Sequence, residues 1–169
     1  MSAFTILPAT LTDWPEIREI YREGILSNHA TFNRVEHIPA TGVEWFAGKL
    51  DGFVFKAVDE DDKMLGWGCL SPTSKREVYR GIVEDSIYVA NMAQGRGIGS
   101  ALLSHLIQLS DNSGFWTMIA SIFPENKASI HIHKKHGFRL VGIREKIAKH
   151  HDDIWRDVAW MERRSPYVL

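Results

Sequence analysis

The chain has 169 residues, which suits one domain with a sizeable hydrophobic core. Apolar residues make up 44% of it and charged residues 24%, and the formal net charge is -1. This composition excludes disordered and collagen-like chains and disfavours nucleic acid as a partner. The single cysteine, Cys69, excludes an intrachain disulfide and favours a reducing compartment. Because the N-terminus lacks a basic signal-peptide region and no apolar run approaches the roughly 20 residues of a membrane span, we expect a cytoplasmic protein without a membrane partner.

The first half of the chain combines short strand patterns with two helical ones. Thr12 or Asp13 can cap the first helix, which carries Pro15 in its first turn, a favoured place for proline. In chain order we expect a strand at residues 4–9, a helix after residue 13, a loop at 27–39, a short helix at about 40–50, a hairpin of 53–59 and 64–71, a basic loop at 72–80 and a central strand at 82–90.

The second half alternates helices and strands. Gly114 ends a helix that starts near Ile98 and has a continuous apolar stripe, and Gly137 ends the next helix as a natural left-handed cap. The other expected elements are a buried strand at 115–123, a helix at 124–136, and two strands at about 138–147 and 155–162 around a polar loop at 149–153. The order predicts one mixed α/β (α+β) domain, residues 1–169, in which strands joined by a crossover helix pair in parallel.

The highest glycine density follows the central strand, in Gln94-Gly95-Arg96-Gly97-Ile98-Gly99. Glycine permits positive φ and close approach of a ligand to the backbone, and the next helix presents unpaired N–H groups and the positive end of its dipole. This combination is typical of a phosphate or pyrophosphate site. The spacing differs from the dinucleotide motif G-x-G-x-x-G and from the P-loop, which has a lysine after its last glycine. On the glycines alone, a turn without a ligand is an equally good interpretation.

Two segments carry a family resemblance. Gln-x-x-Gly-x-Gly after a strand ending in Ile-Tyr-Val, followed by Ala-Leu-Leu, resembles the acetyl-CoA-binding segment of the GNAT superfamily of N-acetyltransferases. Asn126-Lys-Ala-Ser129 and Ile132-His-Lys-Lys-His-Gly-Phe138 are similar to the Asn…(Tyr/His)-x-x-x-Gly-Phe segment of that superfamily, in the expected order and at the expected separation. The resemblance implies the GNAT fold, a mixed sheet of about seven strands with about four helices, splayed between strands 4 and 5.

A closer resemblance extends over most of the chain. The HATFN stretch at 29–33, the Val-Glu-x-Ser-Ile-Tyr-Val core of residues 79–89 and the ending Trp155-Arg-Asp157-Val resemble phosphinothricin and methionine sulfoximine N-acetyltransferases. That family implies direct transfer of the acetyl group to the α-amine of a small amino acid whose side chain ends in a tetrahedral, oxygen-bearing group, and it implies a homodimer. The loop at 149–155 is longer than the family's turn, and His136 stands where an apolar residue is common, so the exact acceptor stays open.

The resemblance implies that acetyl-CoA is held mostly by the main chain. The N–H groups of residues 95–100 would bind the diphosphate, and the backbone of the splayed strand would pair with the pantetheine arm and donate one bond to the thioester oxygen. Arg96 either adds charge or lies in solvent, and Asn126 either contacts the cosubstrate or caps its helix. The expected acetyl-CoA residues are Ile87, Tyr88, Val89, Gln94, Gly95, Arg96, Gly97, Ile98, Gly99, Ser100 and Asn126.

Two side chains are the expected catalytic residues. Glu84 is the expected general base, because burial beside an apolar thioester channel raises the pKa of a carboxylate toward the working pH. The alternative is an ion pair with Arg76 or Arg80. By resemblance, His133 protonates or hydrogen-bonds the departing CoA sulfur, and the alternative is a histidine satisfied within its helix. The eight histidines form no zinc motif, so we expect no metal.

The acceptor is expected beside the central strand, whose alternation places Glu84 and Ser86 on one face and Asp85 on the other. Lys75 and Arg76 lie just ahead of this strand, where cations could bind a carboxylate or the oxyanion, although a solvated Lys75 is an equally good interpretation. The expected acceptor residues are Phe32, Lys75, Arg76, Tyr79, Glu84, Asp85 and Ser86. The alternative functions are an acetyltransferase for a protein N-terminus or a polyamine, and an acyl-CoA-binding module without catalysis.

Overall fold

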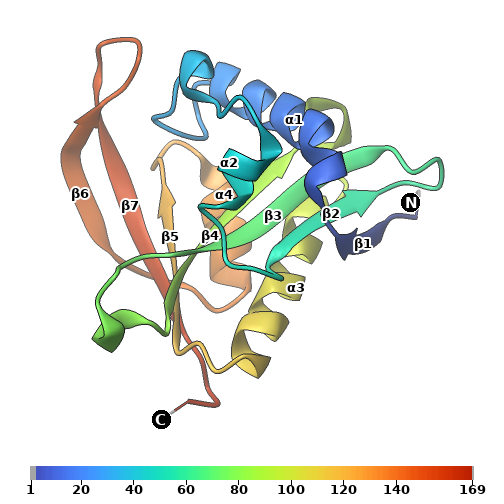
Figure 1. Ribbon diagram of the computed structural model, residues 1–169. Helices are drawn as coiled ribbons and strands as arrows, with labels where there is room; N and C mark the ends of the chain where they lie inside the picture. Colours follow the sequence, from blue (N-terminus) through green and yellow to red (C-terminus); the bar gives the residue numbers. More distant parts are fainter. Residues whose placement is uncertain (1–2, 169) are drawn as a thin grey trace.

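A seven-stranded sheet organises the computed structural model, which describes residues 3–168 (Figure 1). The strands are β1 (Thr5–Pro8), β2 (Val54–Val58), β3 (Met64–Pro72), β4 (Ile82–Val89), β5 (Thr117–Ile122), β6 (Arg139–Lys149) and β7 (Trp155–Arg164). They lie in the order β1-β2-β3-β4-β5-β7-β6, and neighbours are antiparallel except for β4 and β5. This parallel pair is joined by a crossover helix, as the sequence predicts.

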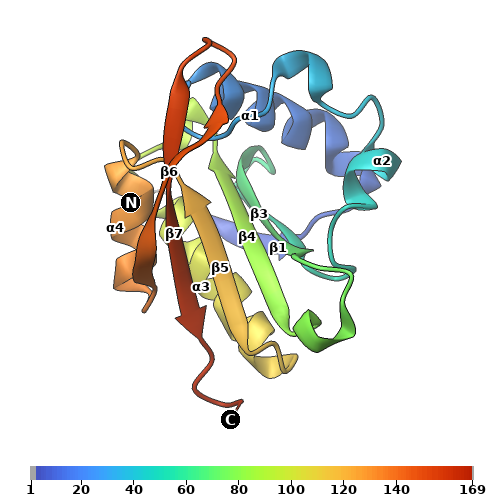
Figure 2. The same cartoon turned by 90° about the vertical axis from the view of Figure 1, so that its left-hand side faces the viewer.

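Helices cover both faces of the sheet. α1 (Trp14–Leu26) and α2 (Gly42–Phe46) lie on one face, and α3 (Ile98–Asn112) and α4 (Lys127–Lys135) lie on the other (Figure 2). The buried apolar residues of the two long helices recur every three or four positions; they include Ile17, Ile20, Tyr21 and Ile25 of α1, and Leu102, Leu103, Leu106 and Ile107 of α3. Short 3-10 turns occur at Leu11–Asp13, Val35–His37, Glu77–Tyr79 and Asn91–Ala93. No helix within residues 3–168 is long and apolar enough to cross a bilayer.

The predicted elements occur in the predicted order, but several ends differ. α4 begins at Lys127 rather than at residue 124, because the side chain of Asn126 accepts a hydrogen bond from the Ser129 N–H at 3.1 Å and caps the helix there. Asp13 stands at the start of α1 as expected, yet its carboxylate pairs with Lys56 at 2.6 Å instead of capping the helix. α2 is shorter than predicted, and β6 and β7 are longer.

The parallel ladder between β4 and β5 stops halfway along β4. Its register pairs are Ile82 with Thr117, Val83 with Met118, and Glu84 with Ile119. β4 continues to Val89, but in the described part of the chain it pairs with β5 no further, and the two strands lean apart toward the upper end of the sheet in Figure 1. The splay predicted between strands 4 and 5 is therefore confirmed. It leaves the β5-facing main chain of residues 85–89 open to an extended ligand.

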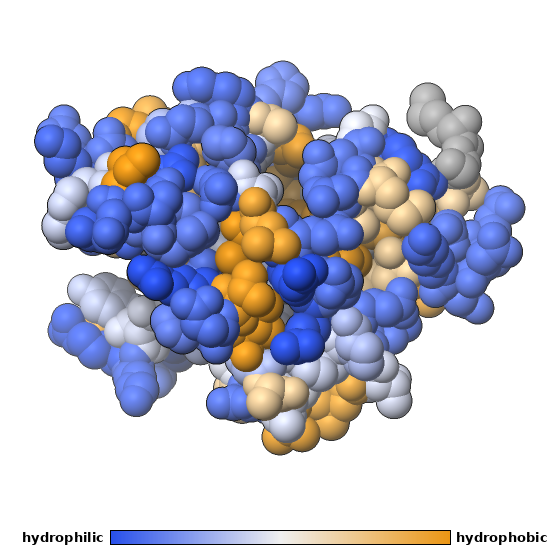
Figure 3. All heavy atoms as spheres, turned by 90° about the horizontal axis from the view of Figure 1, so that it is seen from above, coloured by the Kyte–Doolittle hydropathy of each residue, from blue (hydrophilic) through white to orange (hydrophobic). Residues whose placement is uncertain are grey.

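An aromatic cluster fastens α1 and α2 to the splayed half of the sheet. The Trp67 indole stacks on the Tyr88 ring at a centroid distance of 4.6 Å, and Trp45 of α2 packs edge-on against Trp67 at 5.1 Å. The Trp67 indole N–H also donates to the Ile17 carbonyl of α1 at 3.1 Å. Burial of these large rings fixes both helices against β3 and β4. Not all apolar side chains are buried in this way. Figure 3, which views the molecule from above, shows a band of hydrophobic residues at the surface between hydrophilic ones.

Gly24 of α1 tests this packing, because a Cβ atom there would lie only 2.5 Å from Cδ1 of Tyr88. Alanine gains about 1 kcal/mol of helix propensity over glycine, but the stacked ring has no room to retreat, and overpacking typically costs about 1–3 kcal/mol. We expect the difference, a fall in the free energy of unfolding of up to about 2 kcal/mol, to appear in urea titrations of Gly24→Ala. The matched control is Gly48→Ala, whose Cβ would meet only the Trp45 carbonyl oxygen at 3.7 Å. A Gly24→Ala protein more stable than the parent would contradict this packing.

Candidate functional site

Two adjoining cavities meet at the splayed end of β4. The glycine-turn cavity has a volume of about 720 Å³ and is lined by the end of β4, the segment that follows it, and the first turns of α3 and α4. The Glu84 cavity has a volume of about 400 Å³ and is lined by residues 29–33, the end of the α2 region, β4 and β5. Both cavities are lined by His29, Ala30, Ile87, Tyr88, Asn126, Ser129 and His133. These shared residues mark where ligands in the two cavities would touch.

The glycine turn presents main-chain N–H groups to the glycine-turn cavity. Gly95 and Gly97 have φ angles of 75° and 81°, in the left-handed region that the sequence predicts for them. Gly97 is the N-cap of α3, and the bond that opens the helix runs from the Ala101 N–H to the Gly97 carbonyl at 3.0 Å. The N–H groups of residues 98–100 therefore precede the hydrogen-bond ladder of the helix. Three such groups at the positive end of a helix dipole suit an anion.

Most residues predicted to bind acetyl-CoA line the glycine-turn cavity: Ile87, Tyr88, Val89, Gln94, Gly95, Gly97, Ile98, Gly99, Ser100 and Asn126. Arg96 is the member of that predicted set that does not line it. Ser100 Oγ forms a hydrogen bond of 2.8 Å with His136 Nε2, so its N–H is the group left for an anion. Asn126 caps α4, as one interpretation predicts, and it also lines both cavities.

At the splay, β4 offers its main chain rather than a reactive side chain. The Tyr88 ring packs against Trp67 and lies edge-on to Tyr21 at 5.1 Å. Burial raises the pKa of Tyr88 far above its ordinary value, so the phenol does not titrate near neutral pH. Tyr88 can therefore take part in binding through its backbone, which is the role that the resemblance implies for residues 87–89.

His133 is the buried member of a histidine–carboxylate pair. Its Nε2 lies 3.1 Å from Asp85 Oδ2, and its Nδ1 lies 2.8 Å from the Ser129 carbonyl oxygen, so each ring nitrogen faces an acceptor. The two side chains are only 6% and 2% exposed. Burial alone would lower the pKa of His133, but the hydrogen bond and charge of Asp85, with the Ser129 carbonyl, outweigh it and raise the pKa. The pair therefore favours the imidazolium form of His133.

Glu84 lies on the opposite face of β4 from Asp85, as the strand alternation predicts. Its Oε1 accepts a hydrogen bond of 2.8 Å from the Ser121 hydroxyl of β5, and it lines the Glu84 cavity. Burial raises the pKa of Glu84 in spite of the hydrogen bond from Ser121, and the charge of Asp85 adds to the rise while that of Lys49 opposes it. A carboxylate with a raised pKa beside a cavity has the properties of a general base.

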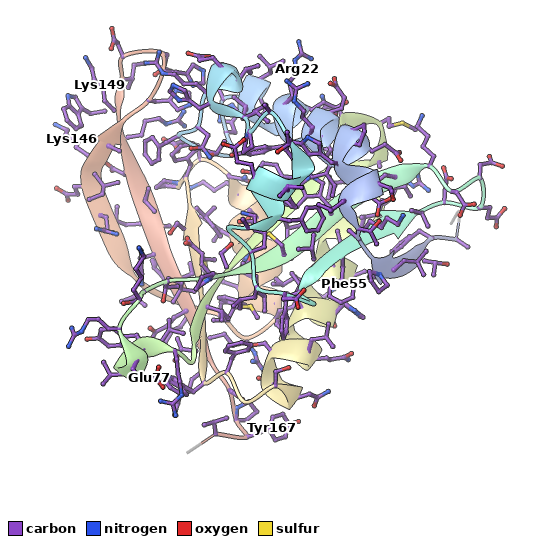
Figure 4. All side chains as sticks on the ribbon, in the orientation of Figure 1. Arg22, Phe55, Glu77, Lys146, Lys149 and Tyr167 are labelled. Carbon is purple, nitrogen blue, oxygen red and sulfur yellow. The ribbon has the colours of Figure 1, made fainter. Side chains whose placement is uncertain are left out.

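The predicted acceptor residues fall into two groups. Phe32, Glu84, Asp85 and Ser86 line the Glu84 cavity, whereas Lys75, Arg76 and Tyr79 line neither cavity. The second group belongs to the loop at 72–80, whose Glu77 lies at the lower end of the molecule in Figure 4, with Arg22 of α1 at the upper end. The structure therefore does not bring this basic loop to the splay of the same chain.

Contacts within the loop at 72–80 explain its position. Arg80 pairs with Glu77 at 3.1 Å, and the Arg76 guanidinium lies 5.0 Å from the centroid of the Tyr79 ring. Within residues 3–168, neither arginine forms the ion pair with Glu84 that the sequence leaves open. The Glu84 carboxylate bonds Ser121 instead, so it stays available at the cavity.

The long loop between β6 and β7 closes against the Glu84 cavity. This loop follows Lys149, at the tip of the hairpin in Figure 4. The His150 side chain is fully buried, with Nδ1 3.0 Å from Asp152 Oδ1, and its ring packs edge-on against Phe123 at 5.9 Å and lies 6.3 Å from Phe32. Phe32 and Phe123 both line the cavity. The extra loop length noted in the sequence thus supports the cavity wall.

Two further contacts tie the β6–β7 loop to the segment before residues 29–33. The His151 Nε2 atom lies 2.7 Å from Asn28 Oδ1, and the Arg156 guanidinium donates to the Asn28 carbonyl at 2.7 Å. The same guanidinium lies 4.2 Å from the centroid of the Phe123 ring. These contacts fix the cavity-lining segment from a part of the chain more than a hundred residues away.

Sequence patterns missed several residues of the Glu84 cavity. Lys49, Trp45 and Ser121 line it, together with Tyr21, but they belong to separate elements and carry no motif. Strand alternation on β5 could have placed Ser121 on the same face as Glu84 if the register were known. Lys49 follows a short helix, and nothing in its local sequence distinguishes it from a solvated lysine. In residues 3–168 no group of three or more His, Cys, Asp or Glu side chains could hold a metal ion.

Comparisons with known proteins agree with this geometry. The model of the Acetyltransferase (GNAT) family matches residues 14–138. An L-methionine sulfoximine/L-methionine sulfone acetyltransferase of Pseudomonas paraeruginosa is 30% identical, over 96% of this chain and 94% of its own. A phosphinothricin acetyltransferase of Sinorhizobium meliloti, solved in complex with AcCoA, superposes with a TM-score of 0.87 at 34% identity, over 99% of this chain and 91% of its own. A ribosomal-protein-alanine N-acetyltransferase of Brucella melitensis gives a TM-score of 0.84 at 30% identity, over 95% and 99%. The chain belongs to the GNAT family of acetyltransferases.

Proposed function

We propose that this acetyltransferase moves an acetyl group from acetyl-CoA to the α-amine of a small amino-acid-like acceptor of the methionine sulfoximine, methionine sulfone or phosphinothricin type. One observation carries the proposal: the two cavities meet at β4, with Glu84 on the acceptor side and the paired His133 at the junction. The names of the relatives from Pseudomonas paraeruginosa and Sinorhizobium meliloti support this acceptor class.

The residues of the glycine-turn cavity fit acetyl-CoA. A Cβ atom on Gly95 or Gly97 would meet nothing within 4 Å, so the space beside the turn is open, and the N–H groups of residues 98–100 supply donors for a diphosphate. The β5-facing edge of residues 85–89 supplies main-chain groups for an extended arm. The solved relative from Sinorhizobium meliloti contains AcCoA, and we assign the same cosubstrate to this chain.

The proposed reaction is a direct transfer between two bound substrates. The amine nitrogen attacks the thioester carbonyl carbon, the new C–N bond forms, and the C–S bond breaks to release the CoA thiolate. The ammonium group loses one proton to solvent before the attack, and Glu84 accepts the second as the C–N bond forms. His133, whose protonated form Asp85 favours, stabilises the negative charge that develops on the sulfur. One of its N–H groups then leaves its present acceptor to protonate the thiolate, and His133 regains a proton from solvent. Asp85 acts through His133 and is a positioning residue.

Other acceptors are less well supported by the cavity. A polyamine would suit an acidic pocket, whereas Lys49 places a positive charge in the Glu84 cavity and Asp85 is already committed to His133. A protein N-terminus is the second candidate, because the structural neighbour from Brucella melitensis is named for one. An acyl-CoA-binding module without catalysis would have no use for Glu84 and His133 at the junction.

We also propose a cytoplasmic homodimer. β6 is an edge strand of the sheet and exposes Leu140, Val141 and Ile143, each between 45% and 48%. Exposed apolar residues on an edge strand are typical of a surface that another chain covers. Cys69 is buried, and burial raises the pKa of its thiol to about 11, so it is an unreactive thiol that needs no oxidising compartment.

A thiol-release assay tests the function directly. With acetyl-CoA, we expect turnover on methionine sulfone, methionine sulfoximine and phosphinothricin, and little on spermidine or on a peptide with an N-terminal alanine. Higher kcat/KM on the peptide would replace the small-molecule acceptor with a protein N-terminus. Acetyl-CoA binding without turnover on any amine would leave only the acyl-CoA-binding module.

Glu84→Gln tests the general base. Removing the proton acceptor while keeping the side-chain shape is expected to lower kcat by about 100- to 10,000-fold, with the unfolding free energy and acetyl-CoA affinity nearly unchanged. Ser121→Ala is the companion variant. Loss of its hydrogen bond removes support for the carboxylate form, so the pKa of Glu84 rises further and the acidic limb of the kcat/KM profile moves to higher pH. Full activity in Glu84→Gln would assign the proton transfer elsewhere.

Asp85→Asn tests the imidazolium. The raised pKa of His133 contributes stability that is fully present below the ordinary histidine pKa and is lost as the pH rises through the raised value. The neutral amide removes the charge that supports His133, so we expect its pKa to fall in an NMR titration of the ring. The loss of stability that the parent shows as the pH rises above the ordinary histidine pKa should also flatten in denaturation experiments. An unchanged His133 titration would show that Asp85 does not hold the proton there.

A further inference from the structure

Lys49 places an ammonium group in the Glu84 cavity, where it forms no salt bridge with the described residues. Its side chain lines the cavity, it is half-buried, and its Nζ lies 4.9 Å from the centroid of the Trp45 ring. Among the ion pairs of residues 3–168, none involves Lys49. The ammonium group instead faces an aromatic ring.

Three other partly buried cations each form a salt bridge, unlike Lys49. Lys56 pairs with Asp13 at 2.6 Å, Arg163 with Asp111 at 2.9 Å and Arg156 with Glu125 at 3.3 Å. Their side chains are 22%, 15% and 11% exposed. A charge taken partly out of water needs compensation, and the fold supplies it in each of these cases. At Lys49 no salt bridge of this kind is present in residues 3–168, which leaves the ammonium group to water or to an anion in the cavity.

The Glu84 cavity also contains a negative charge, on the carboxylate of Glu84. Glu84 lines it from β4, and Lys49 is among the groups that act on the Glu84 carboxylate. Asp85 does not compete for Lys49, since its carboxylate faces His133. Apart from the paired Asp85 and His133, the cavity therefore presents one carboxylate and one ammonium group, with the apolar side chains of Phe32 and Phe123 beside them. This is the charge pattern that a zwitterion with an apolar part would complement.

We propose that Lys49 binds the α-carboxylate of the acceptor and makes a free amino-acid carboxylate a requirement for acetylation. The inference deepens the proposed function and rests on it. With the carboxylate at Lys49, the α-amine of the same molecule is directed toward Glu84, since the two groups of an amino acid are attached to one carbon. The anion could also be a side-chain phosphinate, but methionine sulfone has no such group, and the two sources are separable by experiment.

Two substitutions separate the charge from the shape of Lys49. Lys49→Met keeps an unbranched side chain over Trp45 and removes the ammonium group, whereas Lys49→Arg keeps the charge. The acceptors are methionine sulfone, its α-amide and phosphinothricin, and kcat/KM is measured for each at saturating acetyl-CoA. The affinity for acetyl-CoA and the urea unfolding curve of each variant serve as controls on the fold.

A hydrogen bond to a charged group corresponds to a preference of about 10- to 100-fold. We expect the parent enzyme to prefer methionine sulfone over its amide by that factor, mainly through KM. Lys49→Met should lose about the same factor on the acid and almost nothing on the amide, so that the preference disappears, and Lys49→Arg should retain most of it. Unchanged acetyl-CoA affinity would accompany this result.

Two outcomes would overturn the role of Lys49. One is a Lys49→Met enzyme that still prefers the acid; the other is a loss confined to phosphinothricin, which would assign Lys49 to the side-chain anion. If the parent acetylates no amine at all, the proposed function fails, and calorimetry on the CoA-bound protein then decides the inference. Methionine sulfone that binds the parent and Lys49→Met equally tightly would refute it, and about 10- to 100-fold weaker binding to the variant would support it.

Discussion

The site depends on the place where the β4–β5 ladder ends. Because pairing stops at Glu84 and Ile119, the next residues of β4 keep one main-chain edge unpaired, and both cavities open at that point. A ladder continued to Val89 would close the gap and remove both. The aromatic cluster around Trp67 and Tyr88 stabilises the splayed end of β4, because it packs this strand against β3 and α1 where β5 no longer pairs with it.

Because side chains alternate along β4, two adjacent carboxylates at this point face opposite sides of the sheet and have different surroundings. Glu84 points to the cavity that contains Lys49, where burial raises its pKa. Asp85, one residue on, points to α4, where its charge raises the pKa of His133. In the proposed mechanism, two neighbouring positions on one strand thus supply a proton acceptor and, through His133, a proton donor. A shift of register by one residue would exchange these tasks and disable both.

Local patterns predicted the geometry of the glycine turn and of the elements around it, because these parts are close in the sequence. The strand, the left-handed Gly95 and Gly97, the start of α3 and the stop at Gly137 all follow from residues within a few positions of each other. The expectation that this turn binds acetyl-CoA came from the family resemblance. The glycine spacing alone is equally compatible with a turn that binds no ligand. The start of α4 was misplaced, since Asn126 rather than Pro124 determines it.

The acceptor side was harder to predict because its parts meet only through the fold. Lys49 and Glu84 line one cavity from separate elements, and the β6–β7 loop contacts Asn28 and Phe123 from the far end of the chain. Conversely, Lys75 and Arg76 are near Glu84 in sequence and absent from its cavity, because they fold onto their own loop. Side chains brought together by loops can change without disturbing the splay or the glycine turn. The same division lets one fold keep a fixed donor site while its acceptor site varies, and in the proposed function it makes the segments around the Glu84 cavity, rather than the motifs, determine the acceptor.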